Sequence, residues 1–224
     1  MHIAAVCFDL YGTLLDIGGM ASSFAAAGVP DAPAFVGDWR RKQLEYAFLS
    51  SLAQAYRDFD DVSALALEFV SEQRGVALDV ATRATLLQTV RLMPPHPDAV
   101  PALTRLRGRT MPLAVLTNGV PASARDALRH AGLLPLLDDV LCVDAVRAYK
   151  PDPRVYALAT ARFACTPREI VFVSSNAWDA WGASHFGFRV AWCNRSRATP
   201  ERLTPAPEIA LAGLHDLEAF VTAP

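Results

Sequence analysis

The feature that most constrains this sequence is a set of six short apolar runs, rich in β-branched residues and separated by helix-length segments. The apolar residues of these runs do not alternate with polar ones, which is typical of strands buried on both faces of a parallel sheet. Segments with helical periodicity, some beginning at Pro or ending at Gly, lie between the runs. The pattern predicts an α/β fold, a doubly wound parallel sheet. The predicted strands are residues 3–8, 112–117, 140–143, 170–174, 189–193 and 208–211.

Residues 16–93 interrupt this alternation. Helical patterns follow one another here without a convincing strand, so the second strand arrives late. The segment ends at the proline cluster "MPPHPD" (93–98), and the stiff turns of such a cluster favour a domain boundary. We therefore expect a catalytic core formed by residues 1–15 and 94–224, with residues 16–93 inserted as an all-helical cap.

Polar residues follow four of the predicted strands. Because ligands bind outside the carboxyl ends of the strands in an open parallel sheet, these residues should meet at one edge. Singly, each has an ordinary structural explanation: Asp9 or Thr117 as a helix cap, Lys150 as an exposed loop residue, Asp179 in a first helical turn. Together they favour a catalytic site. The set comprises Asp9, Thr117, Asn118, Lys150, Ser174, Ser175, Asn176 and Asp179.

Composition and charge narrow the class of partner. The chain has 21 Lys and Arg against 23 Asp and Glu, a net charge of -2, and contains no basic block. We therefore expect no nucleic acid partner and, because no apolar run reaches the ~18 residues of a membrane span, no membrane partner. A small-molecule substrate and a cytoplasmic location fit the sequence better.

Four motifs resemble the haloacid dehalogenase superfamily in their order and in their spacing around a helical insertion: "FDLYGT" (8–13), "TNG" (117–119), "YKPD" (149–152) and "SSNAWD" (174–179). Three finer features resemble the L-2-haloacid dehalogenases of this superfamily. These features are Tyr11, two residues after Asp9, and the segments "WRRKQLEY" (39–46) and "FVSSNAWDA" (172–180). The resemblance covers nearly the whole chain and implies a Rossmann-like core with a helical cap.

The resemblance also implies a reaction. Asp9 would attack the α-carbon of an L-2-haloalkanoic acid in line, releasing halide with inversion and forming an aspartyl ester. Water would then attack the carbonyl of Asp9 and release the D-2-hydroxy acid, a covalent route in two easier steps. The residues implied to be catalytic are Asp9, Thr117, Lys150, Ser174, Asn176 and Asp179.

The halide requires positive charge, and two neighbouring arginines of the predicted cap offer it. The family places its halide-binding arginine directly after the tryptophan, which selects Arg40, with Asn118 opposite. Arg41 lies four residues before Glu45, so a surface ion pair is its alternative. Arg41 stands where a neutral polar residue is frequent, and Thr117 where serine is common. The expected substrate-binding residues are Leu10, Tyr11, Arg41, Leu44, Phe59, Tyr156 and Trp178.

Two residues that differ from those of the superfamily's phosphatases indicate whether the site can bind a metal ion. Phosphatases carry an aspartate where this chain has Tyr11, and a metal-binding aspartate where it has Ser175. A hard divalent cation prefers oxygen anions, so we expect no metal and no other cofactor. Two alternatives remain open: a magnesium-dependent small-molecule phosphatase, and a catalytically silent module that binds an organic acid. A homodimer is expected from the resemblance alone.

Overall fold

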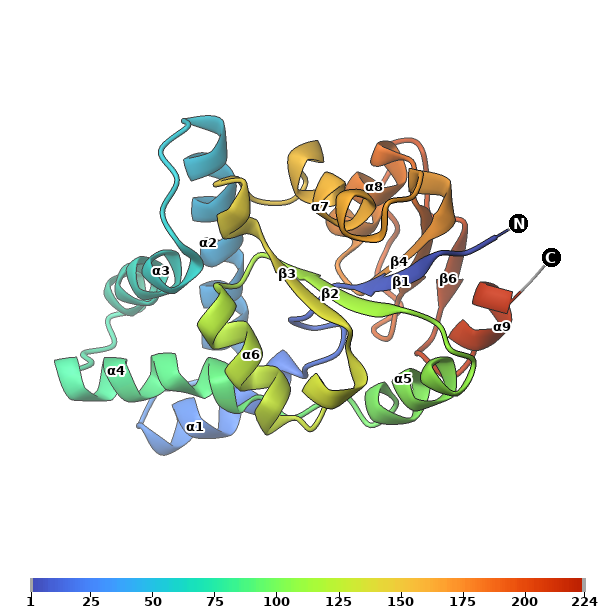
Figure 1. The fold of residues 1–224 in the computed structure, drawn as a ribbon. Coiled ribbons are helices and arrows are strands. Elements are labelled where there is room, and N and C mark those ends of the chain that lie inside the picture. Colours follow the sequence, from blue (N-terminus) through green and yellow to red (C-terminus); the bar gives the residue numbers. More distant parts are fainter. Residues whose placement is uncertain (1, 223–224) are drawn as a thin grey trace.

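The computed structural model describes residues 2–222, and a six-stranded parallel sheet forms its centre (Figure 1). The strand order is β3-β2-β1-β4-β5-β6, so the chain winds outward from β1 in both directions. All six predicted strands are present and the predicted fold class is confirmed. The strands are β1 (Ala5–Phe8), β2 (Leu113–Thr117), β3 (Asp139–Cys142), β4 (Ile170–Ser174), β5 (Arg189–Cys193) and β6 (Ile209–Leu211).

Both faces of the sheet are covered. Successive side chains of a strand point to opposite faces, so Val6 and Phe8 belong to one apolar cluster and Cys7, between them, to another. Helices α5, α6 and α9 cover the first face, and α7 and α8 cover the second. Every residue of β1, β2 and β4 is buried, which explains why these strands read as uninterrupted apolar runs. The helices are α1 (Ala21–Ala26), α2 (Ala32–Leu52), α3 (Phe59–Gln73), α4 (Val80–Gln88), α5 (Ala99–Gly108), α6 (Pro121–His130), α7 (Pro153–Phe163), α8 (Ala177–Phe186) and α9 (Leu217–Thr222), with 3₁₀ helices at Ile17–Met20, Thr89–Leu92, Leu134–Leu136, Val143–Ala145 and Pro167–Glu169.

Local sequence signals set several helix ends. Asp58 and Asp79 cap α3 and α4, because each side chain accepts a hydrogen bond from the backbone amide three residues on. Asp152 caps α7, which opens on Pro153. Gly187 ends α8 in the left-handed conformation, with a φ of 108° that a side chain rarely adopts. These caps explain where α3, α4, α7 and α8 begin or end.

Between β1 and β2 the described elements are all helical. Helices α1–α4 gather beyond the end of β1, on the side where the strand leads toward them (Figure 1). The loop after β3 holds this layer to the core, because the Tyr149 hydroxyl donates to the Arg57 carbonyl at 2.7 Å and its amide to Ser51 at 2.8 Å. We propose that residues 16–93 act as a cap over the sheet edge. No helix among residues 2–222 is both long and apolar enough to span a membrane.

Candidate active site

Asp9 lies directly after β1, where its amide donates to the Val173 carbonyl at 2.9 Å. Its carboxylate accepts three hydrogen bonds: from the Lys150 ammonium to Oδ1 at 3.1 Å, and from the Thr13 hydroxyl and the Asn176 amide to Oδ2, both at 2.9 Å. The residue is only 6% exposed. Three donors around this buried carboxylate fix its direction.

Thr13 is a site residue to which the sequence interpretation gave no role. Besides donating to Asp9, its hydroxyl oxygen accepts from the Ser175 amide at 2.8 Å and lies 3.1 Å from the Ser175 hydroxyl. It therefore ties the loop after β1 to the loop after β4. The signal was available in the sequence, because Thr13 ends the quoted motif "FDLYGT".

Asp179 and Lys150 form a buried pair behind Asp9. The Lys150 ammonium donates to Asp179 Oδ2 at 3.0 Å as well as to Asp9, and Tyr156 donates to Asp179 Oδ1 at 2.8 Å. Burial alone would lower the pKa of Lys150, but the carboxylates of Asp179 and Asp9 raise it above its ordinary value. Burial raises the pKa of Asp179, with the charge of Lys150 acting in the opposite direction. A carboxylate with a raised pKa is suited to accept a proton.

Tyr156 corrects one expectation. It was expected to bind substrate, but it is fully buried and its hydroxyl is engaged by Asp179, through Oδ1 at 2.8 Å and the carbonyl at 3.3 Å. Its ring packs edge-on against Phe172 of β4, with the centroids 5.9 Å apart. Tyr156 is thus a positioning residue for Asp179.

Two further expected catalytic residues, Thr117 and Ser174, and the expected halide-binding residue Asn118 lie at the same edge and hold the loops in place. The Thr117 hydroxyl accepts from the amide two residues on at 3.1 Å. Asn118 Oδ1 accepts from the Lys150 amide at 3.0 Å, and the Ser174 hydroxyl accepts from the Asn176 amide at 3.2 Å. The structure thus brings the polar ends of β1, β2 and β4 and the loop after β3 into one cluster. Their chemical roles stay predictions.

Arg40 is the cation that the cap directs into this region. Its guanidinium carbon lies 5.7 Å from the centroid of the Phe59 ring, which stacks on Tyr11 at 6.3 Å. Its Nε is buried and has no hydrogen-bond partner among the described residues. Burial lowers the pKa of Arg40, against the opposing charge of Asp9, yet a guanidinium stays protonated in proteins. A partly buried cation whose buried Nε lacks a partner is suited to bind an anion.

Arg41 does not belong to this site. Its side chain is 79% exposed and forms a surface ion pair with Asp38, so the expected substrate contact is wrong, and the alternative of a surface ion pair holds with Asp38 in place of Glu45. Lys42 takes Glu45 instead, at 2.8 Å. The reason is helical geometry, since consecutive residues of α2 point about 100° apart and only Arg40 faces the core.

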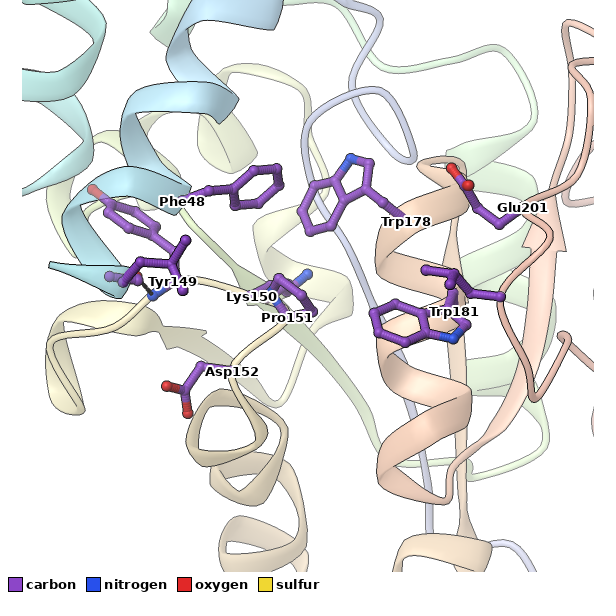
Figure 2. Close-up of a pocket in the computed structure, with 11 residues that line it drawn as sticks. Phe48, Tyr149, Lys150, Pro151, Asp152, Trp178, Trp181 and Glu201 are labelled. Carbon is purple, nitrogen blue, oxygen red and sulfur yellow. Dashed lines mark hydrogen bonds between the residues drawn. The ribbon is translucent and has the colours of Figure 1, made fainter. Parts of the chain in front are cut away.

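The expected apolar wall is spread over both layers. Leu10 and Phe59 are buried, whereas Leu44 and Trp178 are partly exposed. Trp178 packs edge-on against Phe48, with the ring centroids 5.2 Å apart, so one side chain from the core and one from the cap meet near Lys150 (Figure 2). Phe48 was not expected from the sequence.

Gly182 on α8 gives a prediction about this cluster. A Cβ at this position would lie 2.6 Å from the Tyr156 hydroxyl and 2.6 Å from Cβ of Pro151, so Gly182→Ala must displace one of them. Because the Tyr156 hydroxyl stabilises ionised Asp179, its loss should raise the pKa of Asp179 further. We expect turnover to fall at least about tenfold and the acid limb of its pH profile to move to higher pH.

The matched control is Gly37→Ala. Gly37 is also helical, and a Cβ there would meet nothing within 4 Å, so the variant should keep wild-type turnover and pH profile. An unchanged acid limb in Gly182→Ala would mean that the Tyr156 contact does not set the pKa of Asp179.

An α/β fold with a helical insertion after its first strand and a carboxylate–ammonium cluster at the sheet edge defines a class of enzyme. A family model described as "haloacid dehalogenase-like hydrolase" matches residues 3–187, and the chain belongs to this family of hydrolases. An (S)-2-haloacid dehalogenase of Pseudomonas putida is 39% identical over 209 residues, covering 92% of this chain and 93% of the relative. Another, from Pseudomonas sp. strain YL, is 39% identical and covers 99% and 96%.

Solved structures agree with these relatives. A crystal structure of an L-2-haloacid dehalogenase superimposes with a TM-score of 0.96 at 39% identity, covering both chains completely. The L-2-haloacid dehalogenase of Xanthobacter autotrophicus with chloropropionic acid covalently bound superimposes with a TM-score of 0.92 at 33% identity, covering 99% of each chain. A magnesium-bound hydrolase of Bacillus subtilis shares the fold at 16% identity, with a TM-score of 0.77. The fold alone therefore does not decide the question of the metal.

Proposed function

We propose that the chain hydrolyses the carbon–halogen bond of L-2-haloalkanoic acids, giving D-2-hydroxy acids and halide with inversion, without a metal or other cofactor. The observation that carries this proposal is Asp9: its carboxylate is held by Lys150, Thr13 and Asn176 at 2.9–3.1 Å, and the helical insertion adds Arg40, whose Nε is buried without a partner among the described residues. The fixed carboxylate of Asp9 can attack the substrate, and the partly buried guanidinium of Arg40 can stabilise the halide anion that leaves. The names of the relatives support the substrate class.

In the first step, an oxygen of Asp9 attacks the α-carbon and the halide leaves with the electron pair of the broken bond. Asp9 is already an anion, so no base is needed. Arg40, with Asn118 opposite, stabilises the departing halide, because fixed charge in a buried site is effective where charge develops. Leu10, Tyr11, Leu44, Phe59 and Trp178 enclose the carbon chain. The covalently bound acid in the Xanthobacter enzyme supports an ester intermediate.

In the second step, water attacks the carbonyl carbon of Asp9 and the hydroxy acid leaves with the oxygen that attacked it. Asp179 accepts the proton of this water, and the raised pKa of its carboxyl supports that role. Lys150, which donates to both carboxylates, holds Asp179 in place, with Ser174 and Asn176 orienting the water. Thr117, at the end of β2, contributes a hydroxyl to the substrate carboxylate.

The same geometry supports the proposal that the reaction needs no metal. The Lys150 ammonium already lies between the two carboxylates of the cluster, and Tyr11 and Ser175 supply no further anion. We expect the chain, after exhaustive chelation, to release chloride from (S)-2-chloropropionate as fast as before and not from the (R) enantiomer. Phosphate monoesters with added magnesium should not be cleaved. Loss of chloride release that magnesium restores, or efficient phosphate release, would contradict the proposal.

A cytoplasmic location and a homodimer complete the proposal. The first rests on the composition of the chain, and the second on the family resemblance.

A further inference from the structure

The segment that returns the chain from the helical insertion to the core is stiff and carries a histidine to which the proposed mechanism gives no role. It is the proline cluster of residues 93–98, in which Pro95 and Pro97 flank His96. A proline has a fixed φ and also restricts the residue before it, so His96 has little backbone freedom. The side chain of His96 is half-buried.

This returning segment pairs with the segment that leaves β1 for the insertion. Leu15 and Pro95 form an antiparallel bridge. Next to it, the His96 amide donates to the Leu14 carbonyl at 2.9 Å. The two crossings between core and insertion therefore form a short antiparallel ribbon, which holds His96 beside the loop after β1.

The His96 side chain bonds the same loop. Its Nε2 lies 3.1 Å from the Gly12 carbonyl oxygen. Because a carbonyl oxygen only accepts, Nε2 carries a proton and donates it. Burial lowers the pKa of His96, and the positive charge of Arg195 lowers it further, so the ring is neutral at pH 7 and its single N–H is the one on Nε2.

Thr13 lies between the two carbonyls that His96 binds. The Gly12 carbonyl and the Thr13 amide belong to one planar peptide group, so a bond that fixes the carbonyl also fixes the plane from which Thr13 starts. On the other side of Thr13, the His96 amide holds the Leu14 carbonyl. The Thr13 hydroxyl in turn donates to Asp9 Oδ2 at 2.9 Å. His96 is thus joined to Asp9 through a single residue.

We propose, on the basis of the function proposed above, that His96 is a positioning residue for Asp9. Its two hydrogen bonds hold the backbone on both sides of Thr13, and the Thr13 hydroxyl then keeps the Asp9 carboxylate in the direction of attack on the α-carbon. Attack in line depends on this direction, because a displacement of about 1 Å can lower a rate about 10²-fold. His96 bonds the backbone behind Asp9, so its loss affects the rate of attack more than the binding of substrate.

The test compares substitutions of His96 by single-turnover chloride release from (S)-2-chloropropionate, with enzyme in excess. His96→Leu keeps much of the bulk of the ring without a donor, and it should lower the maximal rate about tenfold while changing the enzyme concentration that gives half of this rate less than twofold. His96→Gln places an amide donor near the position of Nε2, so it should stay within about threefold of wild type. His130→Leu is the matched control, because His130 is exposed at the end of α6, and it should match wild type.

A double variant tests whether His96 acts through Thr13. Thr13→Val removes the hydroxyl at nearly the same size and should slow the step at least about tenfold. Adding His96→Leu to Thr13→Val should then cost less than twofold more, because the contact that His96 supports is already gone. Three results would overturn the inference: a further tenfold loss in the double variant, equal losses in His96→Leu and His96→Gln, or no loss in His96→Leu.

Amide hydrogen exchange tests the same inference without any activity. The amides of residues 13, 14 and 15 all donate to the Leu10 carbonyl, so their exchange reports whether the loop after β1 is held. Exchange should be about tenfold faster in His96→Leu than in wild type, and unchanged in His96→Gln. If wild type releases no halide, the proposed function fails, and exchange then decides about His96. Equal exchange in His96→Leu and wild type would show that His96 does not hold the loop.

Discussion

Asp179→Asn is expected to release a single equivalent of halide and then to stop. The attack on the α-carbon uses the ionised carboxylate of Asp9, which Lys150, Thr13 and Asn176 still hold, so the first step needs no base. Hydrolysis of the ester needs a proton acceptor, and the amide of asparagine is not one. Turnover should fall by about 10³-fold, as for the loss of a general base. Rapid-quench halide measurement and the mass of the Asp9 peptide will show both effects.

The variant keeps the size of the side chain, and its carbonyl oxygen can accept from Lys150 or from Tyr156, which bond different oxygens of Asp179. Asp144→Asn, a change of the same kind at the 3₁₀ helix after β3, is the control and should leave turnover unchanged. If Asp179→Asn turns over at more than a tenth of the wild-type rate, the base is another group. If it releases no halide at all, Asp179 is required before or during the attack.

Arg40→Ala should slow the first step by about 10²- to 10³-fold, whereas Arg41→Ala should change it less than twofold. Arg40 is partly buried, with a buried Nε that has no partner among the described residues, while the Arg41 side chain is 79% exposed and bound to Asp38. Exposed ion pairs contribute little, so Arg41→Ala is a matched control one residue away. Single-turnover halide release with excess enzyme measures the step directly.

Arg40→Lys sharpens the comparison, because it keeps the charge and removes the planar donor group. It should lie between wild type and Arg40→Ala. Equal losses in Arg40→Ala and Arg41→Ala would contradict the assignment of the halide to Arg40. A loss confined to KM would mean that Arg40 binds the substrate carboxylate and not the leaving halide.

The sequence was sufficient to predict the sheet and its reactive edge. Buried parallel strands appear as apolar runs, and the residues that end them must meet, so Asp9, Lys150 and Asp179 could be grouped without coordinates. Thr13 was within reach as well, because it closes the motif that contains Asp9. Its role depends on contacts with a distant loop, through Ser175, and spacing along the chain does not specify those.

Side-chain partners across helices could not be predicted in the same way. Tyr156 was expected at the substrate and instead binds Asp179, because the packing of α7 against α8 directs its hydroxyl. Arg41 has two acidic neighbours at helical spacing, Asp38 and Glu45, and propensity does not choose between them. These features arise from tertiary contacts.

The identity of the nucleophile is tested most directly by one turnover of wild-type enzyme in heavy-oxygen water, with enzyme in excess over (S)-2-chloropropionate. If Asp9 forms the ester, the water oxygen enters its carboxylate, because the attack is at the carbonyl carbon and the ester oxygen leaves with the product. The account predicts a mass increase in the Asp9 peptide and unlabelled hydroxy acid. Label in the hydroxyl of the product and none in the Asp9 peptide would contradict it, because water would then attack the substrate directly.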